Sequence, residues 1–189
     1  MEVLLKRHTL TVDQYHQIFE AGIITEKDKV ELVRGEIIAM SPKGSKHSFY
    51  VKRITDLFYE RLRQQVVVSV QDPIQLDDYS ESEPDIALSL PPLERYLDQH
   101  PKAKEVFLLV EVASSSLEYD KQIKLPLYAE AGIPEVWIVD IANREIIVAK
   151  NPDEGIYSSL VNYSVDNTLK LSIRDHAFSI PVAKILSTK

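Results

Sequence analysis

The sequence contains no cysteine, and this absence removes several kinds of chemistry at once. Disulfide bonds, thiolate metal sites and a cysteine nucleophile are excluded, so carboxylates, histidines, lysines and hydroxyls must carry any reaction. The chain also lacks an apolar run near the roughly 20 residues that a membrane helix needs. Its N-terminal stretch has no apolar region or cleavage site typical of a signal peptide. We therefore expect a cytoplasmic protein with no membrane partner.

An excess of positive charge is missing as well. The formal net charge is −7, which argues against binding nucleic acid by bulk electrostatics, because phosphate contacts need clustered lysine and arginine. A divalent ion held by some of these acids would reverse the local sign of the charge. The 44% hydrophobic and 27% charged fractions over 189 residues are those of an ordinary globular domain.

The apolar patterns predict helices and strands in alternation. A short helix is expected after Thr11 and ends near Gly22, and a hairpin follows in which strands 29–33 and 36–40 flank Arg34-Gly35. A long helix is expected over 46–64, with apolar residues at helical spacing: Phe49, Ile54, Leu57, Phe58 and Leu62. Apolar runs predict further strands at 66–70 resumed at 74–76, at 86–90, at 107–113 and at 135–140.

The remaining segments complete a single domain over 1–189. A polar loop is expected at 77–83 and an amphipathic helix at 120–131, in which Pro126 should cause a kink unless it lies in the first turn. Beyond the core over 10–150, residues 151–189 are expected to form a C-terminal strand meander and a short helix.

One strand carries an unusual charge. The run Phe107 to Ala113 is apolar apart from Glu111, and a carboxylate in such a strand costs several kcal/mol unless something neutralises or coordinates it. Asp85 likewise lies directly before an apolar strand. If the two strands are neighbours, both carboxylates converge on one point and offer the oxygen ligands that Mg²⁺ prefers. The alternatives are a strand-edge acid at Asp85 and a buried ion pair at Glu111.

The helix after this strand supplies a candidate amine. Asp120 and Lys124 are four residues apart and share a helix face, whereas Lys121 faces elsewhere. A helix packed over the strand would aim Lys124 at the carboxylates, and the alternative is a solvated pair on the helix surface.

Pro84-Asp85 on one strand and Glu111-Val112-Ala113 on the next resemble the PD-(D/E)xK phosphodiesterase superfamily. Ala113 stands where that motif usually has its lysine, and some branches recover the lysine from the following helix. The longer pattern is similar to one of these, the Uma-two family of endonucleases. The resemblance covers roughly residues 10 to 150 and rests on Glu31 to Glu36, Pro42, His47, Gln71, Pro84-Asp85, Glu111-Val112, Ser114, Asp120, Lys124, Tyr128 and Trp137 to Asp140.

The resemblance implies an α/β fold with a restriction-endonuclease-like core, in which helices flank a mixed central sheet. An N-terminal helix and hairpin and a C-terminal antiparallel extension are added to this core. The implied activity is metal-dependent hydrolysis of phosphodiesters, with DNA as the expected substrate, Mg²⁺ or Mn²⁺ as the cofactor and a homodimer as the assembly.

The same resemblance assigns the site residues. Asp85, Glu111 and the carbonyl of Val112 become metal ligands, and Lys124 replaces the missing strand lysine, with Lys121 as the runner-up. Glu31 becomes an accessory acid of the site. Weaker candidates are His47, Gln71 and Asp120.

Two other functions remain open. The acidic composition and the absent strand lysine are compatible with a catalytically inactive module that keeps the nuclease fold for binding or assembly. A hydrolase using Ser114 as nucleophile and His47 as base is disfavoured, because no G-x-S-x-G elbow surrounds any serine.

Overall fold

A six-stranded mixed sheet forms the centre of the protein, and its strand order is β10-β9-β8-β7-β6-β3. The structure is a computed structural model that describes residues 7–62 and 65–187. The strands are β3 (Val67–Ser69), β6 (Ile86–Ser89), β7 (Val106–Ala113), β8 (Glu135–Asp140), β9 (Glu145–Asp153) and β10 (Ile156–Ser164). β7 and β8 are parallel, and the other neighbours are antiparallel. The expected mixed sheet is confirmed.

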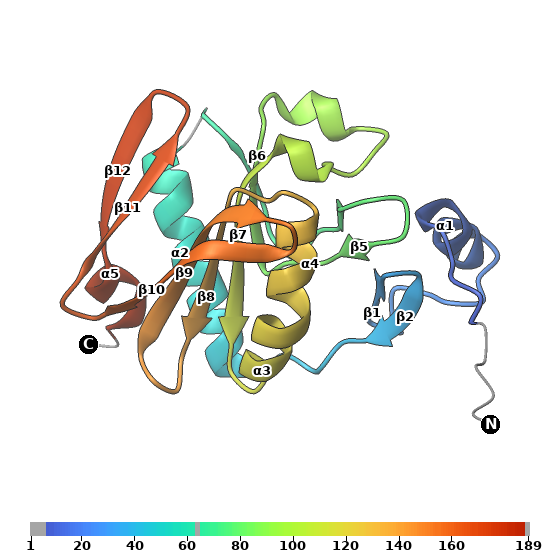
Figure 1. The fold of residues 1–189 in the computed structure, drawn as a ribbon, viewed down its shortest axis with the longest axis horizontal. Coiled ribbons are helices and arrows are strands. Elements are labelled where there is room, and N and C mark those ends of the chain that lie inside the picture. Colours follow the sequence, from blue (N-terminus) through green and yellow to red (C-terminus); the bar gives the residue numbers. More distant parts are fainter. Residues whose placement is uncertain (1–6, 63–64, 188–189) are drawn as a thin grey trace.

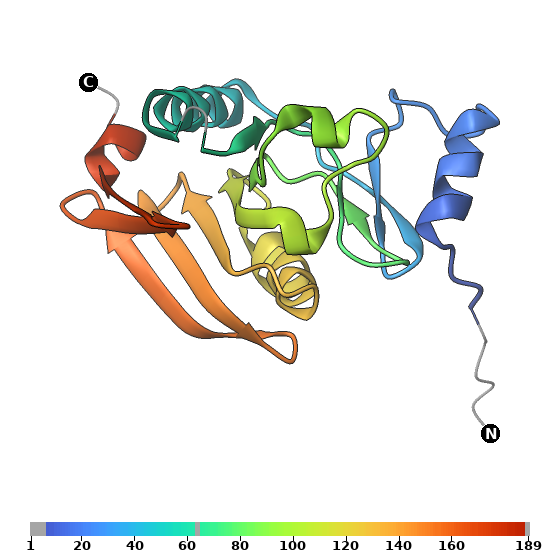
Figure 2. The ribbon, with the colours of Figure 1, turned by 90° about the horizontal axis from the view of Figure 1, so that it is seen from above.

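Helices cover both faces of this sheet (Figures 1 and 2). The long helix α2 (Ser45–Leu62) lies on one face, and a helical segment made of α3 (Leu117–Tyr119), η3 (Asp120–Lys124) and α4 (Leu125–Glu130) lies on the other. Side chains alternate along β7 because successive strand residues point to opposite faces. Leu108 and Val110 join the core beneath α2, whereas Leu109 joins the core beneath α4. Glu111 is in phase with Leu109 and therefore faces the α4 side.

The expected long helix is present from Ser45 to Leu62, and the last two expected residues, 63–64, lie outside the described residues. The expected spacing was wrong at Phe49, which is 49% exposed. Buried positions of α2 recur three or four residues apart, at His47, Tyr50, Val51, Ile54, Leu57, Phe58 and Leu62. Phe49 falls outside this stripe, and the Arg53 guanidinium lies over its ring, 5.6 Å from the centroid.

A second sheet of four short strands adjoins the first, in the order β2-β1-β5-β4. β1 (Val30–Val33) and β2 (Glu36–Ala39) form the expected hairpin, and α1 (Val12–Glu20) packs against it. The expected loop at 77–83 contains the strand β5 (Glu81–Ser82), which pairs with β1 and with β4 (Ile74–Gln75). The segment at 74–76 was wrongly taken as a resumption of β3, because it belongs to this second sheet.

The hairpin turn depends on Gly35. Its φ of +77° is left-handed, and a Cβ built there would lie 2.5 Å from Thr9 Cβ. Gly22 also has a left-handed φ, of +70°, but a Cβ there meets nothing within 4 Å among the described residues.

We expect Gly22→Ala to lower the free energy of unfolding by about 1–2 kcal/mol from backbone strain alone. Gly35→Ala should cost a further 1–3 kcal/mol or so from the clash, and urea unfolding of both variants measures the difference. Equal losses of unfolding free energy in the two variants would contradict the clash inferred at Gly35.

The C-terminal residues continue the core. β9 extends to Asp153 and pairs with β10 in the central sheet. β11 (Thr168–Ile173) and β12 (His176–Pro181) form a separate two-stranded sheet, of which β12 was not expected. With α5 (Val182–Leu186), this sheet buries apolar side chains in the core beneath α2.

Two 3-10 turns, η1 (Leu93–Tyr96) and η2 (Ala103–Glu105), connect β6 to β7. Among the described residues no helix is both long and apolar enough to cross a membrane.

Candidate active site

The central sheet brings the two acids singled out in the sequence together. β6 and β7 are antiparallel neighbours in which Ile86 pairs with Val110. One step further along this register places Asp85 opposite Glu111, and such cross-strand pairs have Cβ atoms about 4.5–5.5 Å apart. Asp85 Oδ2 also accepts a hydrogen bond of 2.9 Å from the backbone N–H of Val112. Both acids therefore lie at the same end of the two strands.

Asp85 is surrounded by donors. His47, in the first turn of α2, lies with Nε2 2.8 Å from Oδ2, and the Gln71 side-chain amide donates to Oδ1 at 3.2 Å. The Lys43 ammonium lies 3.3 Å from Oδ1. Burial disfavours the ionised form of Asp85, but His47, Lys43 and the Val112 N–H together hold its pKa below the usual range. Asp85 is therefore a carboxylate at neutral pH.

Lys124 forms ion pairs with acids on the other side of the site. Its ammonium donates to Glu31 Oε2 and to Ser82 Oγ, each at 2.7 Å, and lies 3.5 Å from Glu111 Oε1. The amine is almost completely buried, and so is Glu31. Although burial disfavours a charged lysine, the neighbouring Glu111, Tyr128 and Glu31 hold its pKa well above the ordinary value. Lys124 is thus a fixed ammonium group shared by two acids.

Glu111 is the acid whose ionisation is least favoured. Burial raises the pKa of Glu111 to about 8, and the negative charges of Asp85 and Asp120 add to this effect, whereas Lys124 opposes it. The Tyr128 hydroxyl donates a hydrogen bond to Glu111 Oε1. Additional positive charge near Glu111 would therefore be favourable.

The helical segment after β7 is irregular around Lys124. It begins at Leu117, three residues before the expected start at Asp120, and residues Asp120–Lys124 form a π turn. The Leu125 N–H bonds to the Asp120 carbonyl, five residues back. A proline such as Pro126 removes one helix hydrogen bond and crowds the preceding turn, and π turns are one way in which helices accommodate this. Both Asp120 and Lys124 face the site as a result.

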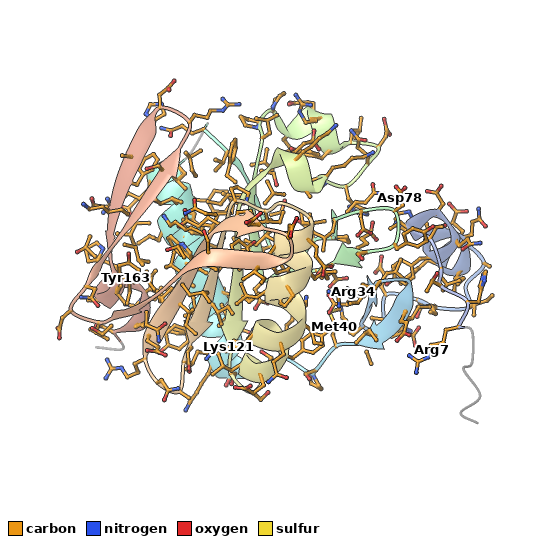
Figure 3. The ribbon with its side chains drawn as sticks, viewed as in Figure 1. Arg7, Arg34, Met40, Asp78, Lys121 and Tyr163 are labelled. Atoms are coloured by element: carbon orange, nitrogen blue, oxygen red, sulfur yellow. The ribbon has the colours of Figure 1, made fainter. Side chains whose placement is uncertain are left out.

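A cavity of about 440 Å³ joins these groups. Its lining includes six of the candidates, namely Glu31, His47, Asp85, Glu111, Asp120 and Lys124. Burial raises the pKa of Asp120 to about 6, against the hydrogen bond that its carboxylate accepts from Ser116. Lys121 does not line the cavity and lies at the α3 end of the helical segment (Figure 3). Of the two candidate lysines, the fold brings Lys124 to the acids.

The site contains groups that were not selected from the sequence: Lys43, Glu83 and Tyr119 line the cavity, and Ser82 bonds to Lys124 and Glu31 behind it. Lys43 follows Pro42 in the loop before α2, and Ser82 and Glu83 precede the Pro84-Asp85 pair. Tyr119 donates to Glu31 Oε1 at 3.1 Å. Lys43, Ser82 and Glu83 lie close in sequence to the residues that carry the family resemblance, and this proximity could have indicated them as site residues. The residues around Tyr119 give no such indication.

Tyr128 links Glu111 to Ser82, which in turn contacts Lys124. Its hydroxyl bonds to Glu111 and lies 3.1 Å from Ser82 Oγ, and the side chain is fully buried. Tyr128→Phe should lower the free energy of unfolding by about 1–3 kcal/mol, because buried polar groups lose a partner. Tyr59→Phe is the matched control, since the Tyr59 hydroxyl makes one hydrogen bond from a 49% exposed side chain. Equal stability of the two variants in urea would contradict the assigned network.

The donor set fits a divalent cation of the Mg²⁺ class. Asp85 and Glu111 are buried carboxylates at one cavity wall, and hard cations prefer oxygen ligands. The raised pKa of Glu111 shows that the cations already present, including Lys124, leave its charge incompletely compensated. Asp85 and Glu111 are therefore the residues that would hold the ion.

Comparisons with known proteins agree with this architecture. The structure is similar to a solved structure described as "a putative nuclease belonging to DUF820 from Anabaena variabilis ATCC 29413", with a TM-score of 0.70 and 14% sequence identity. The alignment covers 94% of this chain and 98% of the other. At this identity the likeness shows the fold. No match was found among the curated proteins.

The mixed sheet and its flanking helices form a nuclease-like α/β fold, as in this solved structure. The model of the Uma2 family, described as "Putative restriction endonuclease", matches residues 12–183. The chain belongs to the Uma2 family, which confirms the resemblance drawn from the sequence. The match extends through β9, β10, β11 and β12 and so includes all of the C-terminal strands.

Proposed function

We propose that the chain is a metal-dependent endonuclease that hydrolyses phosphodiester bonds in DNA. The observation that carries this proposal is one cavity where Asp85, Glu111 and the buried ammonium of Lys124 meet. The nuclease description of the Uma2 family supports the same class of reaction.

Mg²⁺ or Mn²⁺ is the proposed cofactor, with Asp85, Glu111 and the Val112 carbonyl as its protein ligands. When bound, such an ion polarises the scissile phosphate and lowers the pKa of a coordinated water. The side chains of Asp85 and Glu111 fix its position on two hydrogen-bonded strands, which is a rigid support for a reacting group.

Lys124 is the proposed positioning and charge-stabilising group. Its ammonium is held by Glu31 and Ser82 at 2.7 Å, so Glu31 acts as the accessory acid that orients the amine. An ammonium at this place would orient the attacking water or stabilise the added negative charge on the phosphate. His47 and Gln71 hold the Asp85 carboxylate, and Asp120 adds negative charge to the same cavity.

A second function is favoured by a different observation. Lys43 and Lys124 already contact the site acids, so these acids have cationic partners within the chain itself. This arrangement suits a catalytically inactive module that uses the nuclease fold for binding or assembly.

Measurements of DNA cleavage and of metal binding distinguish an active nuclease from an inactive binding module. We expect nicking of plasmid, linear, branched or single-stranded DNA in the presence of Mg²⁺ or Mn²⁺ and none in EDTA. Asp85→Asn should abolish this nicking, whereas Asp56→Asn on α2, outside the cavity, should leave it unchanged. Absence of nicking on every substrate, together with no measurable Mn²⁺ affinity, would establish the inactive module instead.

A homodimer is the proposed assembly, because cleavage of duplex DNA requires two strand cuts. β10 lies at the edge of the central sheet and exposes Leu160 and Val161, at 57% and 44%. Sedimentation measurements on the full chain give the assembly state, and a monomer that cuts both strands would contradict this part of the proposal.

A further inference from the structure

A second group of metal-ligating side chains lies outside the candidate active site. His16 on α1, Glu81 on β5 and His100 in the connection between η1 and η2 each offer one ligand atom, and these atoms all lie within 4.8 Å of one another. None of the three residues lines the cavity that contains Asp85 and Glu111. They line a different cavity, of about 490 Å³.

The contacts within this group already converge on Glu81. His16 Nε2 lies 2.9 Å and 3.0 Å from the two carboxylate oxygens of Glu81. The Glu81 side chain is only 6% exposed, whereas the His16 side chain is 43% exposed. The ring of His100 stands edge-on to that of His16, with the centroids 6.1 Å apart and an interplanar angle of 71°. A buried carboxylate is thus faced by two imidazoles from separate segments.

We propose that His16, Glu81 and His100 form a binding site for a transition-metal ion of the Zn²⁺ class. Two imidazoles and one carboxylate suit Zn²⁺ and similar metals, whereas Mg²⁺ prefers oxygen ligands throughout. In a tetrahedral Zn²⁺ site, metal–ligand distances of about 2.0–2.2 Å place two N or O ligands of one ion about 3.3–3.6 Å apart. The group therefore needs to contract by about 1.5 Å at most, and the exposed His100 can move to allow this. The His16 ring would bind through Nε2 and keep its proton on Nδ1.

The ion would add a direct link between three segments that already meet through backbone hydrogen bonds, from Val12 N–H to Asp78 and from Gln75 N–H to Pro101. α1 lies at the end of the molecule opposite β11 and β12 (Figure 1), and the core cluster beneath it contains three buried residues, Val12, Tyr15 and Leu32. Ligation would tie this helix to β5 and to the connection that carries His100. Glu81 also precedes Ser82, which contacts Lys124 and Glu31 in the candidate active site. The proposed role is therefore to fix the N-terminal helix and the strand that supports the active site.

Titration of the full chain with Zn²⁺, followed by calorimetry and thermal unfolding, tests this proposal. With a large excess of Mg²⁺ present to occupy the active-site acids, we expect one Zn²⁺ to bind and to raise Tm. His16→Gln and His100→Gln should each weaken Zn²⁺ binding at least about tenfold, as expected for loss of one ligand. Substitution by Co²⁺ should give the visible absorption of a nitrogen-ligated ion in the parent and lose it in both variants.

Two controls locate the ion. His176→Gln removes an exposed histidine on β12, far from the site, and should leave Zn²⁺ affinity unchanged. Glu111→Gln should also leave it unchanged, whereas loss of affinity in Glu111→Gln would place the ion in the active-site cavity and overturn the proposal. Equal Zn²⁺ affinity in the parent and in His100→Gln would overturn it as well, and this exposed position keeps the test valid if His16→Gln fails to fold.

Discussion

Glu111→Gln is expected to reduce metal-dependent DNA cleavage by at least about 100-fold, since it removes one of the two carboxylates proposed to hold the metal ion. The amide has nearly the shape of the carboxyl group but is a much weaker ligand for Mg²⁺. Because burial already raises the pKa of Glu111 to about 8, loss of its charge costs the fold little. We expect the free energy of unfolding to stay unchanged or to increase, with Lys124 still held by Glu31 at 2.7 Å.

The matched control is Glu118→Gln, which changes an exposed acid on α3, seven residues further along the chain. It should cut DNA at the parental rate. Rates measured with Mg²⁺ under single-turnover conditions, beside urea unfolding of both variants, give the two quantities needed. Parental cleavage by a folded Glu111→Gln variant would refute the assignment of this residue.

Lys124→Met is expected to abolish cleavage and also to destabilise the protein. The ammonium neutralises Glu31, whose side chain is 1% exposed, so its removal leaves a buried carboxylate without a cation. Breaking a buried ion pair in this way costs about 3–5 kcal/mol. Adding Glu31→Gln to Lys124→Met should recover part of this loss, because the two residues act as a pair. Cleavage should not recover, since the amine is still missing.

Lys121→Met is the control for Lys124 and distinguishes the two lysines proposed from the sequence. Lys121 does not line the cavity, so its replacement should change stability by no more than about 0.5 kcal/mol and leave cleavage intact. Unfolding and cleavage measurements on the two single variants are sufficient. Loss of cleavage in Lys121→Met with normal cleavage in Lys124→Met would reverse the roles assigned here.

Much of the fold was predictable because local patterns and tertiary contacts agree. The expected strand at 135–140 is β8 itself, and the hairpin around Arg34-Gly35 follows from its turn residues. An acid inside the apolar run at 107–113 implied a partner, and the structure supplies Lys124 at 3.5 Å from Glu111. Of the three ways in which that charge could be neutralised, namely a bound cation, a basic side chain or a raised pKa, the structure shows the last two.

Features created by contacts between distant segments were not predictable from local patterns. β5 has two residues and exists because β1 and β4 pair with it, while its own sequence is polar. The helical segment begins at Leu117 and contains a π turn in which Asp120 and Lys124 are buried, and the local pattern predicted neither this start nor the turn.

Side chains from remote segments complete the candidate site in the same way. Tyr119 reaches Glu31 across 88 positions of sequence, and Lys43 enters from the loop before α2. The His16, Glu81 and His100 group likewise combines three segments, none of which has a metal-binding spacing of its own.

We propose that Asp85 and Glu111 hold one divalent cation between them. A crystal of the full chain soaked in Mn²⁺ would locate this ion in an anomalous difference map. We expect a peak about 2.0–2.5 Å from carboxylate oxygens of both residues, in the cavity that Lys124 lines. Density for well-ordered Asp85 and Glu111 side chains without such a peak, at saturating Mn²⁺, would contradict it.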